Sequence, residues 1–393
     1  MNILQKCRSL ISAVCFIIFN RICCIFIPLK EKQVCFLAET HAGLNGNLEA
    51  VYNYLSENRK DLGLTFIIYT KEDRRERHGL ASVLKIWKAI SVSKYIFLDD
   101  LYTTTSYMKR RSGQEIVQLW HGAGAYKKFG HSRRDLQVRP GGKMRVHKGY
   151  KKYTKAIVSG SKIAWCYAEA FDLDIEKVYA VGTPRMDELF DERNVENVKR
   201  AFLEKHPDFK NKKLVLFAPT YRGTLVREAD YDFEKANLNG LIECLGEEYV
   251  ILTRWHPALK NNIKRGLATI RKCDFGNRII DFSDYKDVND LLIACDVMVT
   301  DYSSIIFDYF PLNKPIVYFA YDEDEYAGGR GLYYPFEKYV FGDVARNFDE
   351  LVKAVSSDHI DYSKREEFYD LFLDSCDGNS TERVCELIWN ENL

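Results

Sequence analysis

The chain has 393 residues, of which 46% are hydrophobic and 29% are charged. This length suits two domains of ordinary size, and this composition excludes an intrinsically disordered chain. The formal net charge of +1 gives no general attraction to polyanions, so only the distribution of charge is informative. The 11 cysteines include no CxxC pair, which favours reduced thiols in the cytoplasm over disulfides or a zinc site.

The N-terminal segment is apolar over residues 10–29, but Asn20 and Arg21 interrupt it and basic residues flank it. An arginine at the centre of a spanning helix costs about 2.5–3.5 kcal/mol, which offsets much of the gain from the apolar residues. We therefore expect residues 1–30 to form a helix that lies on the membrane surface, with a spanning anchor and a buried core helix as alternatives. No A-x-A cleavage site follows, and the basic flanks suit an anionic leaflet. The expected location is the cytoplasmic face of the cell membrane.

Beyond residue 30, short apolar runs alternate with helical patterns. Strands are predicted at 33–39, 65–69, 94–98, 115–120, 156–159 and 178–181, and then at 214–218, 249–253, 279–281, 297–300 and 315–318. Alternation of strands and helices is typical of βαβ units and parallel sheets. The predicted fold class is α/β, with Rossmann-like domains at 31–210 and 211–363. We expect a helical tail at 364–393 to cross back over the first domain.

Residues 126–155 carry eleven lysines and arginines against one acid, Asp135. Such a run is either a solvated loop or a binding surface for a polyanion or an anionic membrane. Aromatic residues are few, and no nucleic-acid-binding module accompanies the run, so nucleic acid is not an expected partner.

A polar turn, Thr300-Asp301-Tyr302-Ser303-Ser304, follows a predicted buried strand and precedes a predicted amphipathic helix. Serine and threonine cap helices well, and the free N–H groups of a helix start attract phosphate. In an open parallel sheet, ligands bind outside the carboxyl ends of the strands. The turn is therefore a candidate phosphate site, and an ordinary helix cap is the alternative.

Two histidines, His121 and His256, lie at the ends of predicted strands in the two halves of the chain. A single histidine is more often structural, but two in equivalent positions favour a shared site between the domains. Imidazole can act as a base or an acid near neutrality. Arg254, two residues before His256, would lie on the same side of an extended strand and could bind phosphate bidentately. Lys127 and Lys128 follow His121. They either add positive charge to the site or are ordinary solvent-exposed lysines.

Taken together, these motifs resemble the CDP-glycerol:glycerophosphotransferases of teichoic acid synthesis, a family that includes ribitol-phosphate transferases and some capsule enzymes. The resemblance extends from about residue 39 to 383. Its pieces are WHG and KKFG (120–130), VGTPRMD (181–187), LFAPTYRG (216–223), RWHP (254–257), TDYSSIIFDY (300–309), NKPIVYFAYD (313–322), RGLYY (330–334) and DGNSTER (377–383).

The resemblance implies a GT-B fold, in which two Rossmann-like domains face each other across a cleft. It also implies that the first domain handles the lipid-linked acceptor and the second the CDP-alcohol. His121 would be the base that acts on the acceptor hydroxyl, and Arg383 in the C-terminal tail would reach back to the donor. The implied residues are His121 and His256 for catalysis, and Arg254, Thr300, Asp301, Ser303, Ser304 and Arg383 for the donor, with Asp301 supporting the loop. From the positive charge that follows His121, and not from the resemblance, we expect the acceptor to contact Gly122, Lys127, Lys128, Arg133 and Arg134.

Two departures from the family pattern are visible. Ala123-Gly124 replaces the usual Thr-Pro after His-Gly, and Tyr221 stands where tryptophan is common. The first departure could reshape the acceptor side, and neither removes a catalytic group.

The expected function is transfer of glycerol phosphate or ribitol phosphate from a CDP-alcohol to a hydroxyl of a lipid-linked teichoic acid or capsule acceptor, with release of CMP. We expect no cofactor and no obligatory metal. One alternative is a GT-B glycosyltransferase that uses a nucleotide sugar. A histidine phosphatase would need arginine directly before His-Gly, where Trp120 stands. A non-catalytic protein that binds polyanions or membranes would leave the paired histidines unexplained.

Overall fold

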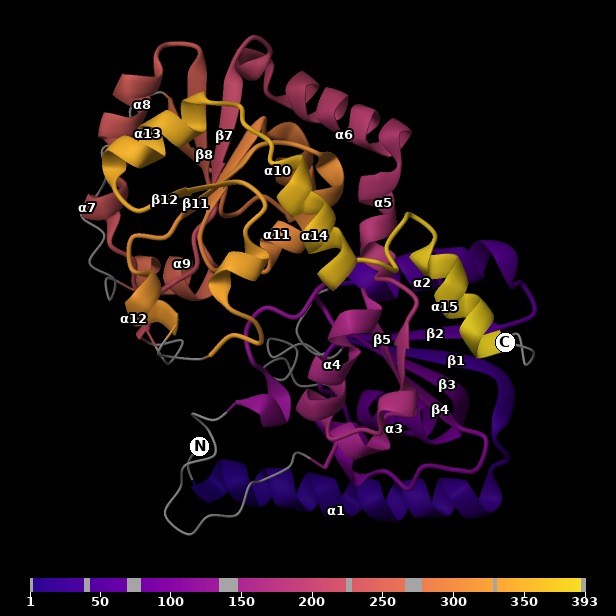
Figure 1. Cartoon of the computed structure of the whole chain (residues 1–393). Helices are drawn as coiled ribbons and strands as arrows, with labels where there is room; N and C mark the ends of the chain where they lie inside the picture. Colours follow the sequence, from indigo (N-terminus) through magenta and orange to yellow (C-terminus); the bar gives the residue numbers. More distant parts are fainter. Residues whose placement is uncertain are drawn as a thin grey trace.

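The computed structural model describes residues 3–38, 43–68, 79–133, 148–223, 228–265, 278–327 and 331–389. Within these ranges the chain forms two parallel six-stranded sheets, each with helices packed on it (Figure 1). We call the half that carries the first sheet the first lobe and the other half the second lobe. The α/β class with two parallel sheets is thereby confirmed.

The first sheet has the strand order β2-β1-β3-β4-β5-β6, with every pairing parallel. Its order reverses between β1 and β3, which makes it a doubly wound sheet. Its strands are β1 (Lys30–Ala38), β2 (Gly63–Ile68), β3 (Ser93–Leu98), β4 (Glu115–Gln118), β5 (Lys155–Val158) and β6 (Val178–Ala180). The associated helices are α1 (Ile3–Phe26), α2 (Gly46–Asn58), α3 (Leu80–Val92) and α4 (Ala164–Phe171). After β6, α5 (Asp187–Phe190) leads to the second lobe, where α6 (Glu192–Lys205) packs on α10 (Val288–Ala294) (Figure 1).

The second sheet has the order β12-β11-β10-β7-β8-β9, the arrangement of a mononucleotide-binding fold with its reversal between β7 and β10. Its strands are β7 (Lys213–Phe217), β8 (Tyr249–Thr253), β9 (Ile279–Asp281), β10 (Val297–Thr300), β11 (Ile316–Phe319) and β12 (Asp343–Ala345). Its helices are α7 (Phe233–Ala236), α8 (Leu238–Leu245), α9 (Pro257–Lys264), α10 (Val288–Ala294), α11 (Ile305–Tyr309), α12 (Glu323–Ala327), α13 (Phe348–Ser356) and α14 (Tyr362–Phe372).

One apolar cluster spans both lobes. Tyr126 of the first lobe stacks on Tyr339 of the second, with ring centroids 4.0 Å apart. The backbone also joins them, because the Lys128 N–H donates to Gly331 O at 3.0 Å and the Tyr333 N–H to Tyr126 O at 3.1 Å. The segment that follows His121 is therefore fixed against the second lobe.

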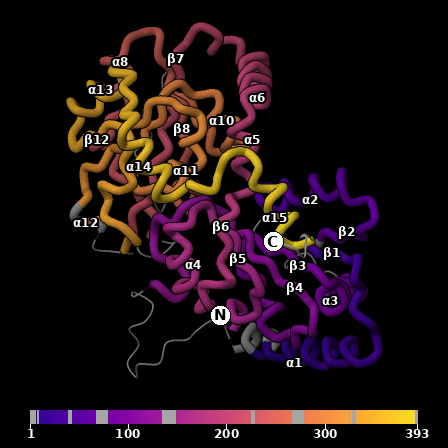
Figure 2. The backbone as a smooth tube through the Cα atoms, turned by 45° about the vertical axis from the view of Figure 1, so that its right-hand side comes forward, coloured from indigo at the N-terminus to yellow at the C-terminus, as the bar shows by residue number. Residues whose placement is uncertain are grey.

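The C-terminal end of the chain connects the two lobes. From α14 on the second lobe, the chain crosses to the first lobe and ends in α15 (Ser380–Trp389), as Figure 2 shows. The last residue of α15, Trp389, packs on Tyr95 and Phe97 of β3, with ring centroids 4.8 and 6.1 Å apart. Burial of this tryptophan anchors α15 on the first sheet.

Helix α1 lies along the first lobe and packs on α3, where Phe16 stacks edge-on against Trp87 at 5.5 Å (Figure 1). Asn20, which interrupts the apolar segment, is buried and donates to Ser91 Oγ at 3.0 Å. The sequence therefore places its polar residue on the side that faces the protein. Among the described helices, none combines the length and apolarity needed to cross a membrane. Association of α1 with a membrane surface stays a prediction.

Candidate functional site

The turn that carries His121 has an unusual backbone. Trp120, two residues after the end of β4, has a φ of +58°, a left-handed conformation that costs a bulky residue about 1–3 kcal/mol. The turn is held by side chains, since Gln118 Oε1 accepts from the Trp120 N–H at 2.9 Å. Asn47 Nδ2 donates to Leu119 O at 3.2 Å and to Trp120 O at 2.7 Å. Strain of this kind, held by its surroundings, is typical of functional sites.

His121 is exposed at the end of this turn, and its Nδ1 lies 3.2 Å from the backbone oxygen of Asp99. A carbonyl oxygen can only accept, so in the neutral ring Nδ1 carries the proton and Nε2 is the basic nitrogen. Burial, with a smaller contribution from Asp100, raises the pKa of the Asp99 carboxyl to about 7. Because Nδ1 is protonated where it meets Asp99 O, His121 has the tautomer of a base that acts through Nε2.

His256 is held in the opposite tautomer. It caps the N-terminus of α9, and its Nδ1 accepts from the Ala258 N–H at 3.1 Å. In the neutral ring the proton is then on Nε2, so that nitrogen is a hydrogen-bond donor. The ring lies 4.7 Å from the ring of Tyr221, between centroids. The two histidines thus differ at Nε2: that of His121 can take a proton, whereas that of His256 can donate a hydrogen bond.

Arg254 precedes His256, and its guanidinium is fixed from one side. Its Nη1 donates to the backbone oxygens of Phe282, Ser283 and Tyr285 at 2.9, 3.2 and 2.6 Å. Burial lowers the pKa of Arg254, and nearby aspartates oppose this effect. Because Nη1 donates to these backbone oxygens, a phosphate would be bound by Nε and Nη2.

Asp301 and Thr300, at the end of β10, lie beneath the surface. The Asp301 carboxylate is fully buried and accepts from the N–H groups of Thr220 and Tyr302 at 2.8 and 2.6 Å. The Thr300 hydroxyl is 1% exposed and donates to Ala218 O at 2.7 Å. Both side chains are therefore engaged inside the protein. Asp301 supports the turn, as the sequence suggested.

Ser303 and Ser304 are the accessible part of the same turn. Ser303 is half-buried and its Oγ accepts from the Ile305 N–H at 3.4 Å, whereas Ser304 is exposed. The helix that follows, α11, has five residues, and Ile306 to Tyr309 are buried. It is therefore not the amphipathic helix that was predicted. Attraction for an anion would come from hydroxyls and local N–H groups, because so short a helix has little macrodipole.

Arg222 is a central residue that the sequence did not single out, although it lies in the LFAPTYRG stretch. It donates to Asp301 Oδ2 at 2.8 Å and to both carboxylate oxygens of Asp322, at 2.5 and 2.9 Å. The rings of Tyr302 and Tyr326 lie 5.3 and 5.0 Å from its guanidinium carbon. Burial disfavours its charged form, but the carboxylates outweigh this and raise the pKa of Arg222.

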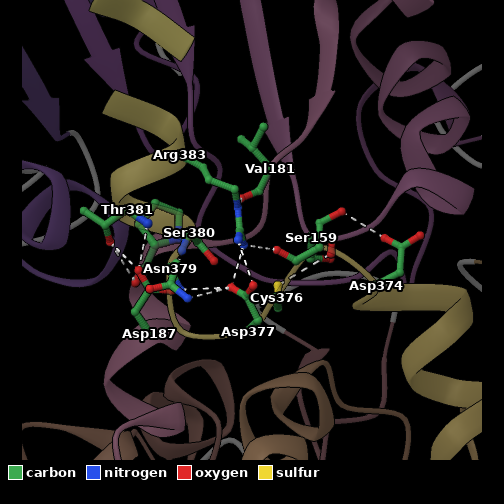
Figure 3. A network of polar contacts seen from close by, with 12 residues as sticks. Ser159, Val181, Asp187, Asp374, Cys376, Asp377, Asn379, Ser380, Thr381 and Arg383 are labelled. Atoms are coloured by element: carbon green, nitrogen blue, oxygen red, sulfur yellow. Dashed lines mark hydrogen bonds and ion pairs between the residues drawn. The ribbon is translucent and has the colours of Figure 1, made fainter. Parts of the chain in front are cut away.

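Arg383 does not lie at this edge of the second sheet. It is on α15, where its Nε donates to Val181 O at 3.0 Å and its Nη2 to Ser375 O at 2.5 Å (Figure 3). Its Nη1 donates to Asp377 Oδ2 at 2.9 Å. Nε thus joins α15 to the end of β6, and the other two nitrogens hold the segment that precedes α15. That Arg383 also reaches back to the donor stays a prediction.

The expected acceptor residues are only partly described. Gly122 follows His121 in the turn, and Lys127 Nζ lies 5.1 Å above the ring of Tyr326 in the second lobe. Lys128 takes part in the backbone pairing between the lobes, and Arg133 ends the described part of this loop. Arg134 and most of the basic stretch after it lie outside the described residues.

The fold brings the other candidates together at one edge. Strands β10, β7 and β8 are parallel neighbours, so the turns with Ser303, Arg222 and His256 leave the second sheet at the same side. The His121 turn packs on α11, where a Cβ added to Gly124 would lie 2.2 Å from Phe307. Over the described part of the chain, no group of three or more His, Cys, Asp or Glu side chains could hold a metal ion.

Comparison with solved structures assigns the fold class. The wall teichoic acid polymerase TagF matches over 100% of this chain and 98% of its own, with a TM-score of 0.74 at 21% identity. The UDP-GlcNAc 2-epimerase of Methanocaldococcus jannaschii has a TM-score of 0.55 at 13% identity, over 91% of this chain and 99% of its own. The chain therefore has the two-lobed α/β fold of these two proteins.

The family is defined by sequence. Residues 18–390 match the family CDP-Glycerol:Poly(glycerophosphate) glycerophosphotransferase, and the chain belongs to this family. The teichoic acid poly(ribitol-phosphate) polymerase of Bacillus spizizenii is 36% identical over 92% of this chain, which spans 57% of that relative. The teichoic acid glycerol-phosphate primase of Bacillus subtilis is 27% identical over 98% of this chain and 99% of its own length. The resemblance seen in the motifs is confirmed.

Proposed function

We propose that this chain transfers glycerol phosphate or ribitol phosphate from a CDP-alcohol to a hydroxyl of a lipid-linked teichoic acid or capsule acceptor, releasing CMP. Family membership and relatives named for both alcohols support this proposal. The observation that carries it is the pair of differently fixed histidines, one with a basic Nε2 and one with a donating Nε2. A base that takes the proton of the attacking hydroxyl and a donor that stabilises charge on the diphosphate both speed such a reaction.

In the proposed reaction, Nε2 of His121 takes the proton of the acceptor hydroxyl. The oxygen attacks the phosphorus that bears the alcohol, the bond from that phosphorus to the oxygen of CMP breaks, and CMP leaves with the electron pair. His256 Nε2–H, the outer nitrogens of Arg254 and the hydroxyls of Ser303 and Ser304 would stabilise charge on the diphosphate. Such catalysis depends mainly on positioning, which suits a turn as firmly held as that of His121.

In this proposal the second lobe binds the CDP-alcohol and the first lobe the acceptor, across a GT-B cleft. Support for the donor side comes from TagF, a variant of which was solved after a soak with CDPG. Gly122, Lys127, Lys128, Arg133 and Arg134 would face an anionic acceptor.

The direct test is incubation of the full chain with CDP-glycerol or CDP-ribitol and a lipid-linked acceptor. We expect CMP release with one of the two donors, and the length of the product separates a primase from a polymerase. Transfer from a UDP-sugar, with none from either CDP-alcohol, would instead identify a glycosyltransferase. Binding of the polymer without release of CMP would indicate a non-catalytic protein.

Substitution of the donor-side residues should weaken binding of the CDP-alcohol more than it slows the chemical step. Arg254→Ala or Ser303→Ala removes a hydrogen bond to a charged phosphate, worth about 1.5–3 kcal/mol. We expect the KM for the CDP-alcohol to rise about 10- to 100-fold, as measured by CMP release over a range of donor concentrations. Ser356→Ala, which removes an exposed hydroxyl on α13, is the control. An unchanged KM in both site variants would place the phosphate elsewhere.

We also propose that α1 lies on the cytoplasmic face of the cell membrane. Support comes from an apolar stripe on its outer side, where five side chains are 50–74% exposed: Leu10, Ile11, Ile18, Ile22 and Ile25. An exposed row of this kind is typical of interfacial helices.

The doubly charged variant Ile11→Glu with Ile18→Glu tests this location. Each isoleucine is expected to contribute about 1.5–3 kcal/mol of apolar burial, so binding to phosphatidylglycerol vesicles should fall at least about 100-fold in a sedimentation assay. Ile175→Glu, at a 52% exposed isoleucine outside α1, is the matched control. Equal vesicle binding by the natural chain, the double variant and the control would show that α1 does not bind the membrane.

A further inference from the structure

Three consecutive backbone oxygens around the His121 turn are held by two distant residues. Asn47, on α2, donates from Nδ2 to Leu119 O and Trp120 O. Arg185, in the short helix η7 (Pro184–Met186), donates from Nη1 to His121 O at 2.7 Å. The two residues are themselves joined, because the Arg185 N–H donates to Asn47 Oδ1 at 2.9 Å. We infer that Asn47 and Arg185 are positioning residues that set the orientation of His121.

Arg185 also reaches the second lobe. Its Nε donates to Asp308 Oδ1 at 3.1 Å, and its Nη2 pairs with Asp308 Oδ2. Asp308 lies on α11, directly after the Ser303 turn, and its side chain is 4% exposed. Burial raises the pKa of Asp308, and Arg185 opposes this by favouring the carboxylate. A single planar guanidinium therefore connects the backbone of His121 with the helix that follows the donor-side turn.

The geometry explains why these residues matter for catalysis. Asn47 is 2% exposed, and its amide holds the carbonyl oxygens of Leu119 and Trp120, while Gln118 Oε1 accepts from the Trp120 N–H. A left-handed Trp120 relaxes toward extended backbone once its carbonyl is released. Such relaxation would swing His121 away from Asp99 O and from the acceptor. A displacement of about 1 Å at a reacting group can cost about 10²-fold in rate.

The assignment rests on the proposed role of His121 as base. Two conservative variants test it in the full chain. Asn47→Asp keeps the acceptor for the Arg185 N–H but loses both amide donors. Arg185→Lys keeps a positive charge for Asp308 but cannot hold Asp308 with two nitrogens and His121 O with a third. Lys162→Gln is the control, because it removes a different ion pair that joins the first lobe to α14, with Asp370.

We expect kcat for CMP release to fall about 10²-fold in Asn47→Asp and Arg185→Lys, with KM for the CDP-alcohol changed less than about threefold. The control should keep the rate of the natural chain. A second readout, which needs no turnover, is ¹⁵N NMR of labelled histidine, with the His121 signal assigned through His121→Asn. The natural chain should show the Nδ1–H form of His121, and both variants should show a mixture of tautomers.

The two readouts separate the possible failures. If the natural chain uses no CDP-alcohol, the proposed function fails, and the tautomer of His121 still decides the positioning role. Folded variants with unchanged kcat and an unchanged His121 tautomer would overturn the inference. So would a loss of stability in denaturant with both catalytic and NMR signatures intact, because that result describes a purely structural contact. If Arg185→Lys does not fold, Asn47→Asp alone decides the outcome.

Discussion

Replacing His121 by alanine is expected to lower kcat for CMP release by about 10²–10⁴-fold, the usual contribution of a general base. The reason is that Nε2 of His121 is the nitrogen left basic by the contact of Nδ1 with Asp99 O. The donor should still bind, because the donor-side candidates Arg254, Ser303 and His256 come from the second lobe. The measurements are steady-state CMP release and calorimetric titration with the CDP-alcohol.

His359→Ala provides the matched control for this experiment. His359 is another exposed histidine, and its Nδ1 lies 2.8 Å from Asp343 Oδ1 in the second lobe. Its removal should leave kcat and donor binding at their natural values. A rate in His121→Ala equal to that of the natural chain would remove His121 from the mechanism.

Replacing Arg222 by methionine is expected to destabilise the protein by about 3–5 kcal/mol, because it leaves a buried charge without its cation. Asp301 is fully buried, and it accepts from Arg222 Nη1 while it holds the backbone of the Ser303 turn. The same change also removes both hydrogen bonds to Asp322. Denaturant unfolding followed by circular dichroism measures the loss.

Arg346→Met is the matched arginine control. Its partner is Glu323, and the two side chains are 60% and 30% exposed, so water screens the pair. The loss of stability should therefore be much smaller than in Arg222→Met. Equal losses in the two variants would show that burial of Asp301 does not determine the effect.

The local pattern of the sequence was enough to predict most of the fold. The apolar run that became β10 (Val297–Thr300) is buried throughout, and it ends at the polar turn as expected. The runs that became the other strands from β1 to β11 were recognised in the same way. Strand β12 was missed, because a three-residue strand with two half-buried side chains has no recognisable period. Strand order required the structure, since periodicity does not encode which strands are neighbours.

Glycine 124 shows how a departure in sequence acquires a meaning only in the fold. The sequence has Ala123-Gly124 where the family usually has Thr-Pro. In the structure Gly124 has a φ of +65°, which proline cannot adopt, and any side chain would collide with Phe307. The close approach of the His121 turn to α11 therefore depends on glycine at this position.

By itself, the sequence determined the α/β class, the family, and the two histidines and the serine turn as candidates, because these follow from local periodicity and from short motifs. Only the tertiary structure decided what each candidate can do. The tautomers of His121 and His256 depend on Asp99 O and the Ala258 N–H. The burial of Asp301 and the engagement of Arg383 likewise depend on partners distant in the chain. Protonation and accessibility are set by such partners, and they are assembled only when the chain folds.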